Sequence, residues 1–155
     1  MSFRIGVLLT VMVVLAPAGV ASEDYPRELR DQWLPLATQG DPDAQYWMGR
    51  SQCCGYGAGY DTAAALRWFC AAAVQGHVDA QYALARQLAG RTTEWRRFGQ
   101  SHFISEAYVW YRVAAEAGHT MAQEYARSLA QDLSNGALRR AQRRIDHWQE
   151  IDCRR

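Results

Sequence analysis

The 155-residue sequence has no lysine and only four histidines, and its charges nearly cancel, with 17 basic and 16 acidic residues. All of its basic residues are therefore arginines, which we interpret as a composition bias of the genome rather than a sign of function. A net charge of +1 leaves no excess of positive charge of the kind that attracts nucleic acid or an anionic membrane. The composition therefore predicts no nucleic-acid partner.

The sequence also lacks the motifs of the common hydrolases. Neither G-x-S-x-G nor H-E-x-x-H is present, and a hydrolase needs a nucleophile, a base and an orienting group in one site. The acidic residues Asp41 and Asp43 stand at an expected helix start, where carboxylates are favoured without any catalytic role. We therefore expect a protein that is not an enzyme, with no catalytic residue, no cofactor and no metal.

The longest apolar run lies close to the N-terminus. Arg4 precedes it, it extends from Ile5 to Leu15, and a proline and several small residues then lead to Ala21. This order is typical of a secretory signal peptide, and the run is shorter than the about 20 residues of a membrane-spanning helix, which is the alternative. We expect residues 1–21 to be removed, leaving 134 of the 155 residues as one domain. The expected location is periplasmic or secreted, without membrane insertion after cleavage.

The rest of the chain is internally similar. The stretches GDPDAQY, GHVDAQY and GHTMAQE begin at Gly40, Gly76 and Gly118, at spacings of 36 and 42 residues. Small and apolar residues recur at i, i+3, i+4 and i+7 within each unit, which is the period of a helix. We expect two helices per unit, from about 44 to 54 and from about 62 to 75 in the first unit. The three glycines are the expected C-caps, and Asp61 is the expected N-cap of the second helix.

This pattern resembles the Sel1-like repeat, a relative of the tetratricopeptide repeat. The resemblance rests on Gly49, Gly55, Gly57, Asp61, Ala65, Trp68, Phe69, Gly76, Ala80, Ala107, Trp110, Tyr111, Gly118 and Ala122. It implies an all-α fold, a short right-handed α-solenoid of two to three helix-turn-helix repeats with a C-terminal capping helix. It also divides the mature chain into a lead-in (22–32), a repeat domain (33–148) and a C-terminal tail (149–155).

The resemblance implies a function as well, because this family usually binds proteins or peptides. We expect an exported, non-enzymatic interaction module or regulator, whose partner is a protein or peptide of the cell envelope. One alternative is a periplasmic immunity or inhibitor protein directed against an envelope-targeting enzyme. Another is a hydrolase acting on cell-wall or β-lactam substrates, for which the sequence offers no site. The sequence does not predict the oligomeric state.

An insertion in the second unit contains the predicted partner-binding residues. The connection between its two helices is six residues longer than in the first unit, and we expect a long loop from 90 to 105. The predicted binding residues are Trp95, Arg96, Arg97, Phe98 and Phe103. Aromatic residues and arginine are enriched at binding hot spots, and an insertion in one solenoid unit maps to one face. The alternative is that these aromatic residues fold back and extend the core.

Four cysteines follow the signal peptide, and four allow three different pairings. Cys53 and Cys54 are adjacent and precede G-x-G-x-G, which we interpret as a turn because a dinucleotide loop needs a preceding strand. Regular helices would place Cys70 about 13 Å from the connecting turn, too far for a disulfide with either of them. The reach of Cys153 on the C-terminal tail is not predictable. We expect thiols that are mostly free or paired between molecules.

Two of the four histidines, His77 and His119, occupy equivalent positions just past an expected helix end. An imidazolium is favourable near a helix C-terminus. We therefore expect a structural role for both residues rather than metal ligation.

Overall fold

The structure is a computed structural model, and it describes residues 25–53, 61–95 and 101–153. The helices in these ranges are α1 (Tyr25–Thr38), α2 (Pro42–Cys53), α3 (Thr62–Ala73), α4 (Val78–Trp95), α5 (Ser101–Glu116), α6 (Thr120–Gln131), α7 (Asn135–Ile145) and the short 3-10 helix η2 (Trp148–Glu150). The described residues contain no strand, so the expected all-α class is confirmed. Within the same ranges, no helix combines the length and the apolar character needed to cross a membrane.

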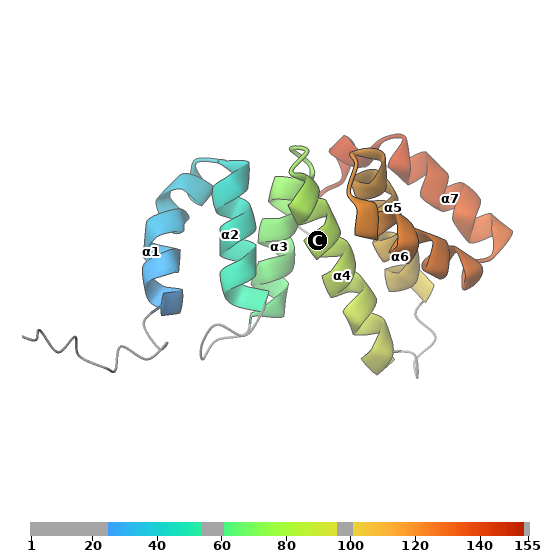
Figure 1. Cartoon of the computed structure of the whole chain (residues 1–155), viewed down its shortest axis with the longest axis horizontal. Coiled ribbons are helices and arrows are strands. Elements are labelled where there is room, and N and C mark those ends of the chain that lie inside the picture. The colour runs from blue at the N-terminus through green and yellow to red at the C-terminus, as the bar shows by residue number, and fades with distance from the viewer. Residues whose placement is uncertain (1–24, 54–60, 96–100, 154–155) are drawn as a thin grey trace, which may run out of the picture.

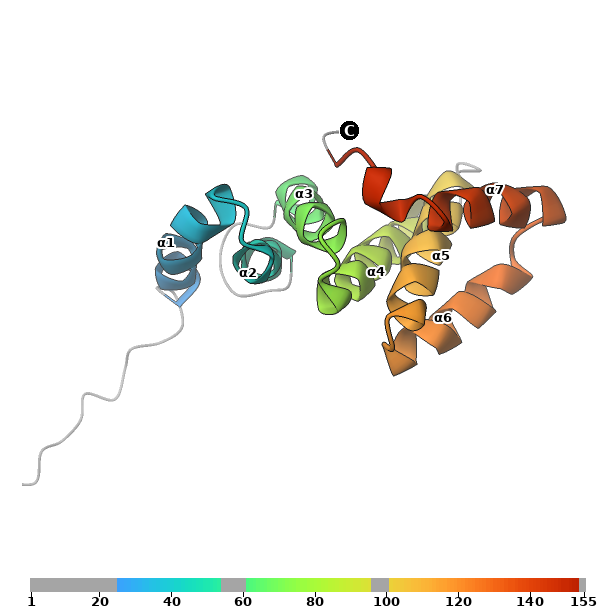
Figure 2. The same ribbon diagram turned by 90° about the horizontal axis from the view of Figure 1, so that it is seen from above.

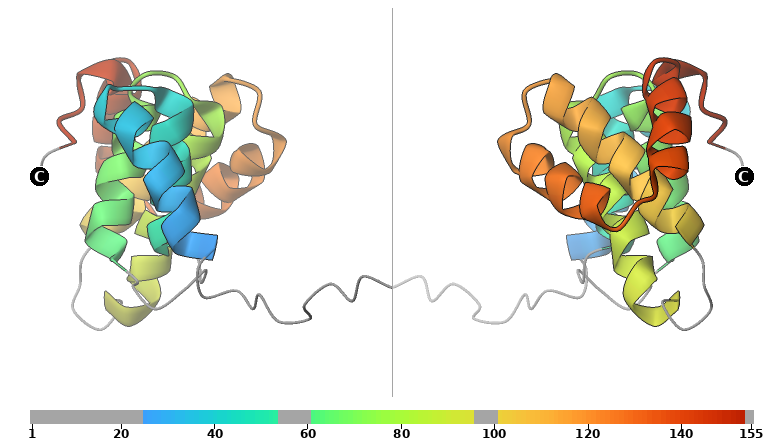
Figure 3. Two further views of the ribbon diagram at one scale, coloured as in Figure 1. Left: turned by 90° about the vertical axis from the view of Figure 1, so that its left-hand side faces the viewer. Right: turned by 90° about the vertical axis from the view of Figure 1, so that its right-hand side faces the viewer.

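The helices from α1 to α5 follow one another in chain order along the longest axis of the molecule, and α6 lies beside α5 (Figure 1 and Figure 2). Each of them packs against the next one, whereas α7 turns back and packs against α5. Seen from above, α6 and α7 lie on opposite sides of the row (Figure 2), and the end views show the same separation (Figure 3). One side of α6 is therefore not covered by α7.

The predicted glycine C-caps are confirmed. Gly40, Gly76 and Gly118 have φ angles of 99°, 92° and 97°, in the left-handed region that glycine adopts without a Cβ clash. Each glycine N–H donates to the carbonyl oxygen three residues earlier, and the next N–H donates to the one five residues earlier. The same tight turn therefore joins α1 to α2, α3 to α4 and α5 to α6.

The residue after each of these glycines caps the helix that follows. Asp41 accepts from the Ala44 N–H through its carboxylate at 2.7 Å, and His77 accepts from the Ala80 N–H through Nδ1 at 3.1 Å. His119 is the corresponding cap of α6. The predicted N-cap Asp61 is also confirmed, since its side chain accepts from the Ala64 N–H.

The structural role expected for the histidines is confirmed, but the expected imidazolium is wrong. Nδ1 of His77 accepts a hydrogen bond, so it carries no proton in this geometry. Its Nε2 lies 3.2 Å from Oδ1 of Asp43, to which it donates. This arrangement requires the neutral ring, because an imidazolium has donors at both nitrogens and cannot cap a helix N-terminus.

Several positions of the predicted pattern lie in the core. Ala65, Phe69, Ala80, Ala107, Trp110, Tyr111 and Ala122 are all buried. Gly49 lies directly against the Phe69 ring, and Trp68 is half-buried beside a smaller cluster of Ala37, Ala44 and Met48. Gly55 and Gly57 lie outside the described residues.

The long loop expected from 90 to 105 is wrong over most of its length. Residues 90–95 are the end of α4 and residues 101–105 are the start of α5. No proline occurs in this stretch, so nothing prevents the helices from continuing. As a result α4 has 18 residues where α2 has 12.

The expectation of mostly free or intermolecularly paired thiols is wrong. Cys70 forms a disulfide with Cys153, at a Cα–Cα distance of 5.5 Å. Cys53 is disulfide-bonded as well, and no cysteine within the described ranges is free. The reason is the course of the chain after α7, which returns to α3 while Trp148 packs edge-on against Trp110. The predicted absence of a bond from Cys53 to Cys70 is confirmed.

Candidate functional site

The sequence-predicted binding residues lie around the connection of α4 to α5. Trp95 is the last residue of α4, and Arg96, Arg97 and Phe98 lie outside the described residues. Phe103 is half-buried in α5 and lines a pocket. The side-chain position is therefore described for Phe103 alone, and the binding role of the segment stays a prediction.

A second surface combines tyrosine and arginine on α2 and α4. Nη1 of Arg50 donates to the hydroxyl of Tyr46 at 3.1 Å, and its guanidinium lies 5.8 Å from the centre of that ring. The guanidinium of Arg86 lies at the same 5.8 Å from the ring of Tyr82. Both residues of this pair recur after 36 positions, so the two helices present the same cation–π contact.

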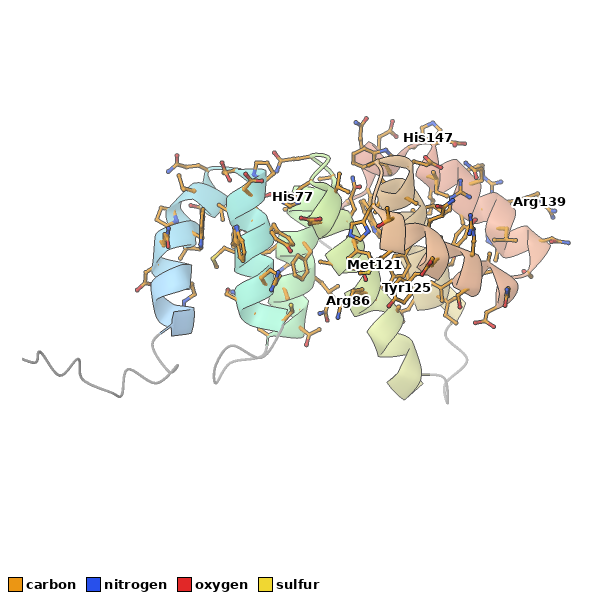
Figure 4. All side chains as sticks on the ribbon, in the orientation of Figure 1. His77, Arg86, Met121, Tyr125, Arg139 and His147 are labelled. Atoms are coloured by element: carbon orange, nitrogen blue, oxygen red, sulfur yellow. A yellow bond between two sulfur atoms is a disulfide. The ribbon has the colours of Figure 1, made fainter. Side chains whose placement is uncertain are left out.

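Exposed aromatic residues occupy one further position of these first helices. Trp47 on α2 and Tyr125 on α6 each stand seven residues after a capping glycine, Gly40 or Gly118, and they are 39% and 47% exposed. Met121, one turn before Tyr125, is 51% exposed. Figure 4 shows Met121 and Tyr125 close to Arg86, between α4 and α6. We name the set Tyr46, Trp47, Arg50, Tyr82, Arg86, Met121 and Tyr125 the tyrosine–arginine face.

Buried neighbours hold the exposed rings of this face in place. Trp47 stacks on Trp33 at a centroid distance of 6.3 Å, and Tyr125 stacks on the buried Tyr111 at 5.2 Å. An exposed ring that is already fixed loses little conformational entropy when a partner binds. Rigid aromatic side chains of this kind are typical anchors of binding surfaces.

Burial raises the pKa of two tyrosines of this region, Tyr82 and Tyr111. It is the main cause that raises the pKa of Tyr82 above its ordinary value, and the neighbouring Tyr125 adds to the effect. Burial likewise raises the pKa of Tyr111, helped by Tyr82 and Tyr125. The Tyr82 and Tyr111 hydroxyls are therefore protonated well above neutral pH, and Arg86 contributes positive charge beside Tyr82.

The tyrosine–arginine face offers stacking, cation–π contacts and hydrogen bonds, which are means of recognition. Within the part of the chain that the structure describes, no three His, Cys, Asp or Glu side chains gather closely enough to hold a metal ion. Sequence reasoning missed this face, although Tyr46, Tyr82, Arg50 and Arg86 follow the same 36-residue spacing as the glycines. That spacing is the signal that could have identified it.

Comparisons with known proteins identify no relative of this chain. No protein-family model matches the chain, and no curated protein or solved structure matches it. The candidate site is therefore defined by its geometry, as a fixed aromatic and cationic surface on an all-helical protein.

Proposed function

We propose that this chain is an exported, non-enzymatic Sel1-like repeat protein that binds a protein or peptide of the cell envelope. In this proposal the helices form a short right-handed α-solenoid of two to three repeats, and α7 is its capping helix. The observation that carries the proposal is the recurrence of one junction. Nε2 of Gln45 donates to the Ala37 carbonyl at 3.2 Å, and Nε2 of Gln81 donates to the Ala73 carbonyl at 3.1 Å.

The recurring junction supports a repeat because it involves buried side chains rather than turns alone. Tyr46 stacks on His77 at 4.7 Å, and Tyr82 stacks on His119 at 4.1 Å. Each stack joins the first helix of one unit to the start of the next unit. Units that interact mainly with their neighbours in this way are the defining property of solenoids, which commonly use extended surfaces to bind partners.

The tyrosine–arginine face is the surface that we propose for the partner. Trp47 and Tyr125 supply exposed aromatic area, and Arg86 supplies a cation beside Tyr82. These features fit a peptide that combines an apolar side chain with an acidic one. The segment with Trp95 and Phe98 is the second proposed surface.

Capture from envelope extract tests the proposal. The immobilised protein is compared with the double variant Trp47→Ala/Tyr125→Ala and with Trp95→Ala/Phe98→Ala, after circular dichroism has established equal helicity. Loss of two hot-spot residues should lower the amount of bound partner by at least about tenfold, since each such residue contributes about 2 kcal/mol or more. The matched control is Arg139→Ala, at an exposed arginine of α7 that Figure 4 shows away from Arg86, Met121 and Tyr125.

The two double variants also locate the site. A loss with the first variant places the partner on the tyrosine–arginine face, and a loss with the second places it on the α4–α5 connection. Capture that both double variants leave unchanged would contradict the proposed binding surfaces, and an extract that yields no bound protein would contradict the proposed function.

A further inference from the structure

A pocket of about 650 Å³ lies on a different part of the molecule, between α3, α4, α5 and the C-terminal segment. Its apolar lining includes Leu66 of α3, Leu84 and Leu88 of α4, and Trp110 of α5. Along α3, the lining residues run from Ala63 to Cys70, which corresponds to a length of about 10 Å at 1.5 Å per residue. This volume and this predominantly apolar lining are those of small-molecule sites, which measure about 300–1,000 Å³.

The C-terminal segment from 148 to 153, here named the strap, closes one side of the pocket. Glu150 to Cys153 contribute to the lining. The strap is held at its start by the contact of Trp148 with Trp110 and at its end by the disulfide from Cys153 to Cys70. The pocket therefore has a wall that is covalently attached to α3, so its shape exists before any ligand binds.

The charges around the pocket are not equivalent. Arg144 forms an ion pair with Glu106, so these two charges compensate each other. Glu150 and Asp152 belong to the strap. Arg67 projects from α3 and forms no ion pair with any residue that the structure describes. Among the pocket-lining residues that the structure describes, it is the cation that is available to a ligand.

We propose that this pocket binds a small molecule with an apolar body and one anionic group, and that Arg67 pairs with the anionic group. The apolar body would cover Leu66, Leu84, Leu88 and Trp110. A guanidinium forms strong, directed hydrogen bonds to carboxylate, sulfonate or phosphate oxygens. The site is separate from the tyrosine–arginine face and does not depend on the proposed protein binding.

A matched pair of fluorescent probes tests this proposal. The probes are 1-anilinonaphthalene-8-sulfonate and N-phenyl-1-naphthylamine, which share the apolar body and differ in the sulfonate. Both are titrated into the purified chain with its disulfides intact, and we expect one molecule of either probe to bind. The variant Arg67→Gln should weaken the sulfonate probe about fivefold, the scale of an exposed ion pair. It should leave the affinity of the neutral probe unchanged.

Two further variants separate this site from nonspecific binding. Ala63→Trp places a large ring at an exposed edge of the pocket and should lower the affinity for both probes by at least about tenfold. Arg139→Gln, at an exposed arginine of α7 outside the pocket, is the matched control and should change neither affinity. Circular dichroism and the thermal unfolding midpoint must be the same for all variants.

The proposal is overturned by any of three results. They are the absence of saturable binding of either probe, equal losses for both probes in Arg67→Gln, and binding that Ala63→Trp does not affect. A selective loss of the sulfonate probe in Arg67→Gln, together with a loss of both probes in Ala63→Trp, supports it.

Discussion

The α2–α3 pair and the α4–α5 pair share one buried hydrogen bond, from Nε2 of Gln45 or Gln81 to a backbone carbonyl. The amide oxygens of these two glutamines, however, are bonded differently. Oε1 of Gln45 accepts from Nε2 of Gln75 at 2.8 Å, which completes the hydrogen bonding of this amide oxygen. Oε1 of the equivalent Gln81 is buried and has no hydrogen-bond partner among the residues that the structure describes. The reason is visible in the chain, since Ala117 stands before Gly118 where Gln75 stands before Gly76. Hydrogen bonds to the backbone thus recur in both pairs, whereas this contact between side chains does not.

The two pairs also differ in how closely their helices approach. At Gly49 of α2, a Cβ atom would lie 2.5 Å from the ring of Phe69 on α3. The equivalent residues of the second pair are Ala85 and Tyr111, both buried. The first pair therefore uses a glycine to admit an aromatic ring, and the second pair accommodates a methyl group at the same position. Positions that correspond in the two helix pairs do not require equal packing.

The largest expected effect concerns this close approach. Gly49→Ala should lower the free energy of unfolding by about 1–3 kcal/mol, because overpacking displaces the fully buried Phe69 ring. The loss should exceed the gain of about 0.5–1 kcal/mol that replacing a helical glycine by alanine normally brings. Chemical denaturation followed by circular dichroism measures the change.

Gly90→Ala is the matched control for this substitution. Gly90 also lies inside a helix, but a Cβ atom there would meet nothing within 4 Å. This variant should gain about 0.5–1 kcal/mol. An equal gain for Gly49→Ala would show that the α2–α3 pair is packed no more tightly than the rest of the protein.

Local signals explain why much of the helix order could be predicted. Gly40, Gly76 and Gly118 each combine a left-handed residue with a helix end, and Asp61 caps the next helix through its own side chain. Such features depend on a few neighbouring residues and are therefore readable in the chain. The expected loop begins at Gly90, a residue type that often ends a helix, whereas α4 continues through Gly90 to Trp95.

Long-range contacts explain what could not be predicted. Cys153 forms a disulfide with Cys70 at a sequence separation of 83 residues, and this pairing depends on how the strap folds back over α3. The sequence does not predict that Met121 and Tyr125 are exposed to solvent either. They are exposed because α7 packs on α5 and leaves this side of α6 uncovered. The aromatic and cationic residues of the candidate site were visible in the sequence, but their position relative to solvent was not.

The unequal hydrogen bonding of the two pairs leads to a smaller expected effect. Gln75→Ala should lower the free energy of unfolding by about 1 kcal/mol, because it leaves Oε1 of the buried Gln45 without its donor. Ala117→Gln should raise the free energy of unfolding by about as much, because it introduces a donor for Oε1 of Gln81. Thermal and chemical denaturation measure both changes.

Gln39→Ala is the control for the first of these variants. Gln39 precedes Gly40 as Gln75 precedes Gly76, but it is exposed, so its replacement should change stability by less than about 0.5 kcal/mol. If Ala117→Gln left stability unchanged while Gln75→Ala lowered it, Gln81 would be satisfied by another group and the contrast between the two pairs would disappear.

The last difference between the pairs emerges only in alkaline solution, because α5 has Tyr111 where α3 has Phe69. Burial, with the nearby Tyr82 and Tyr125, raises the pKa of Tyr111 above its ordinary value of 10.0. The unfolded chain therefore loses this proton first, so the contribution of Tyr111 to stability is complete below pH 10 and declines as the pH rises further. Between about pH 8 and about pH 11, the free energy of unfolding should fall less in Tyr111→Phe than in the unaltered protein. Chemical denaturation at both pH values measures this, and an equal fall in both proteins would mean that the ionisation of Tyr111 is not linked to folding.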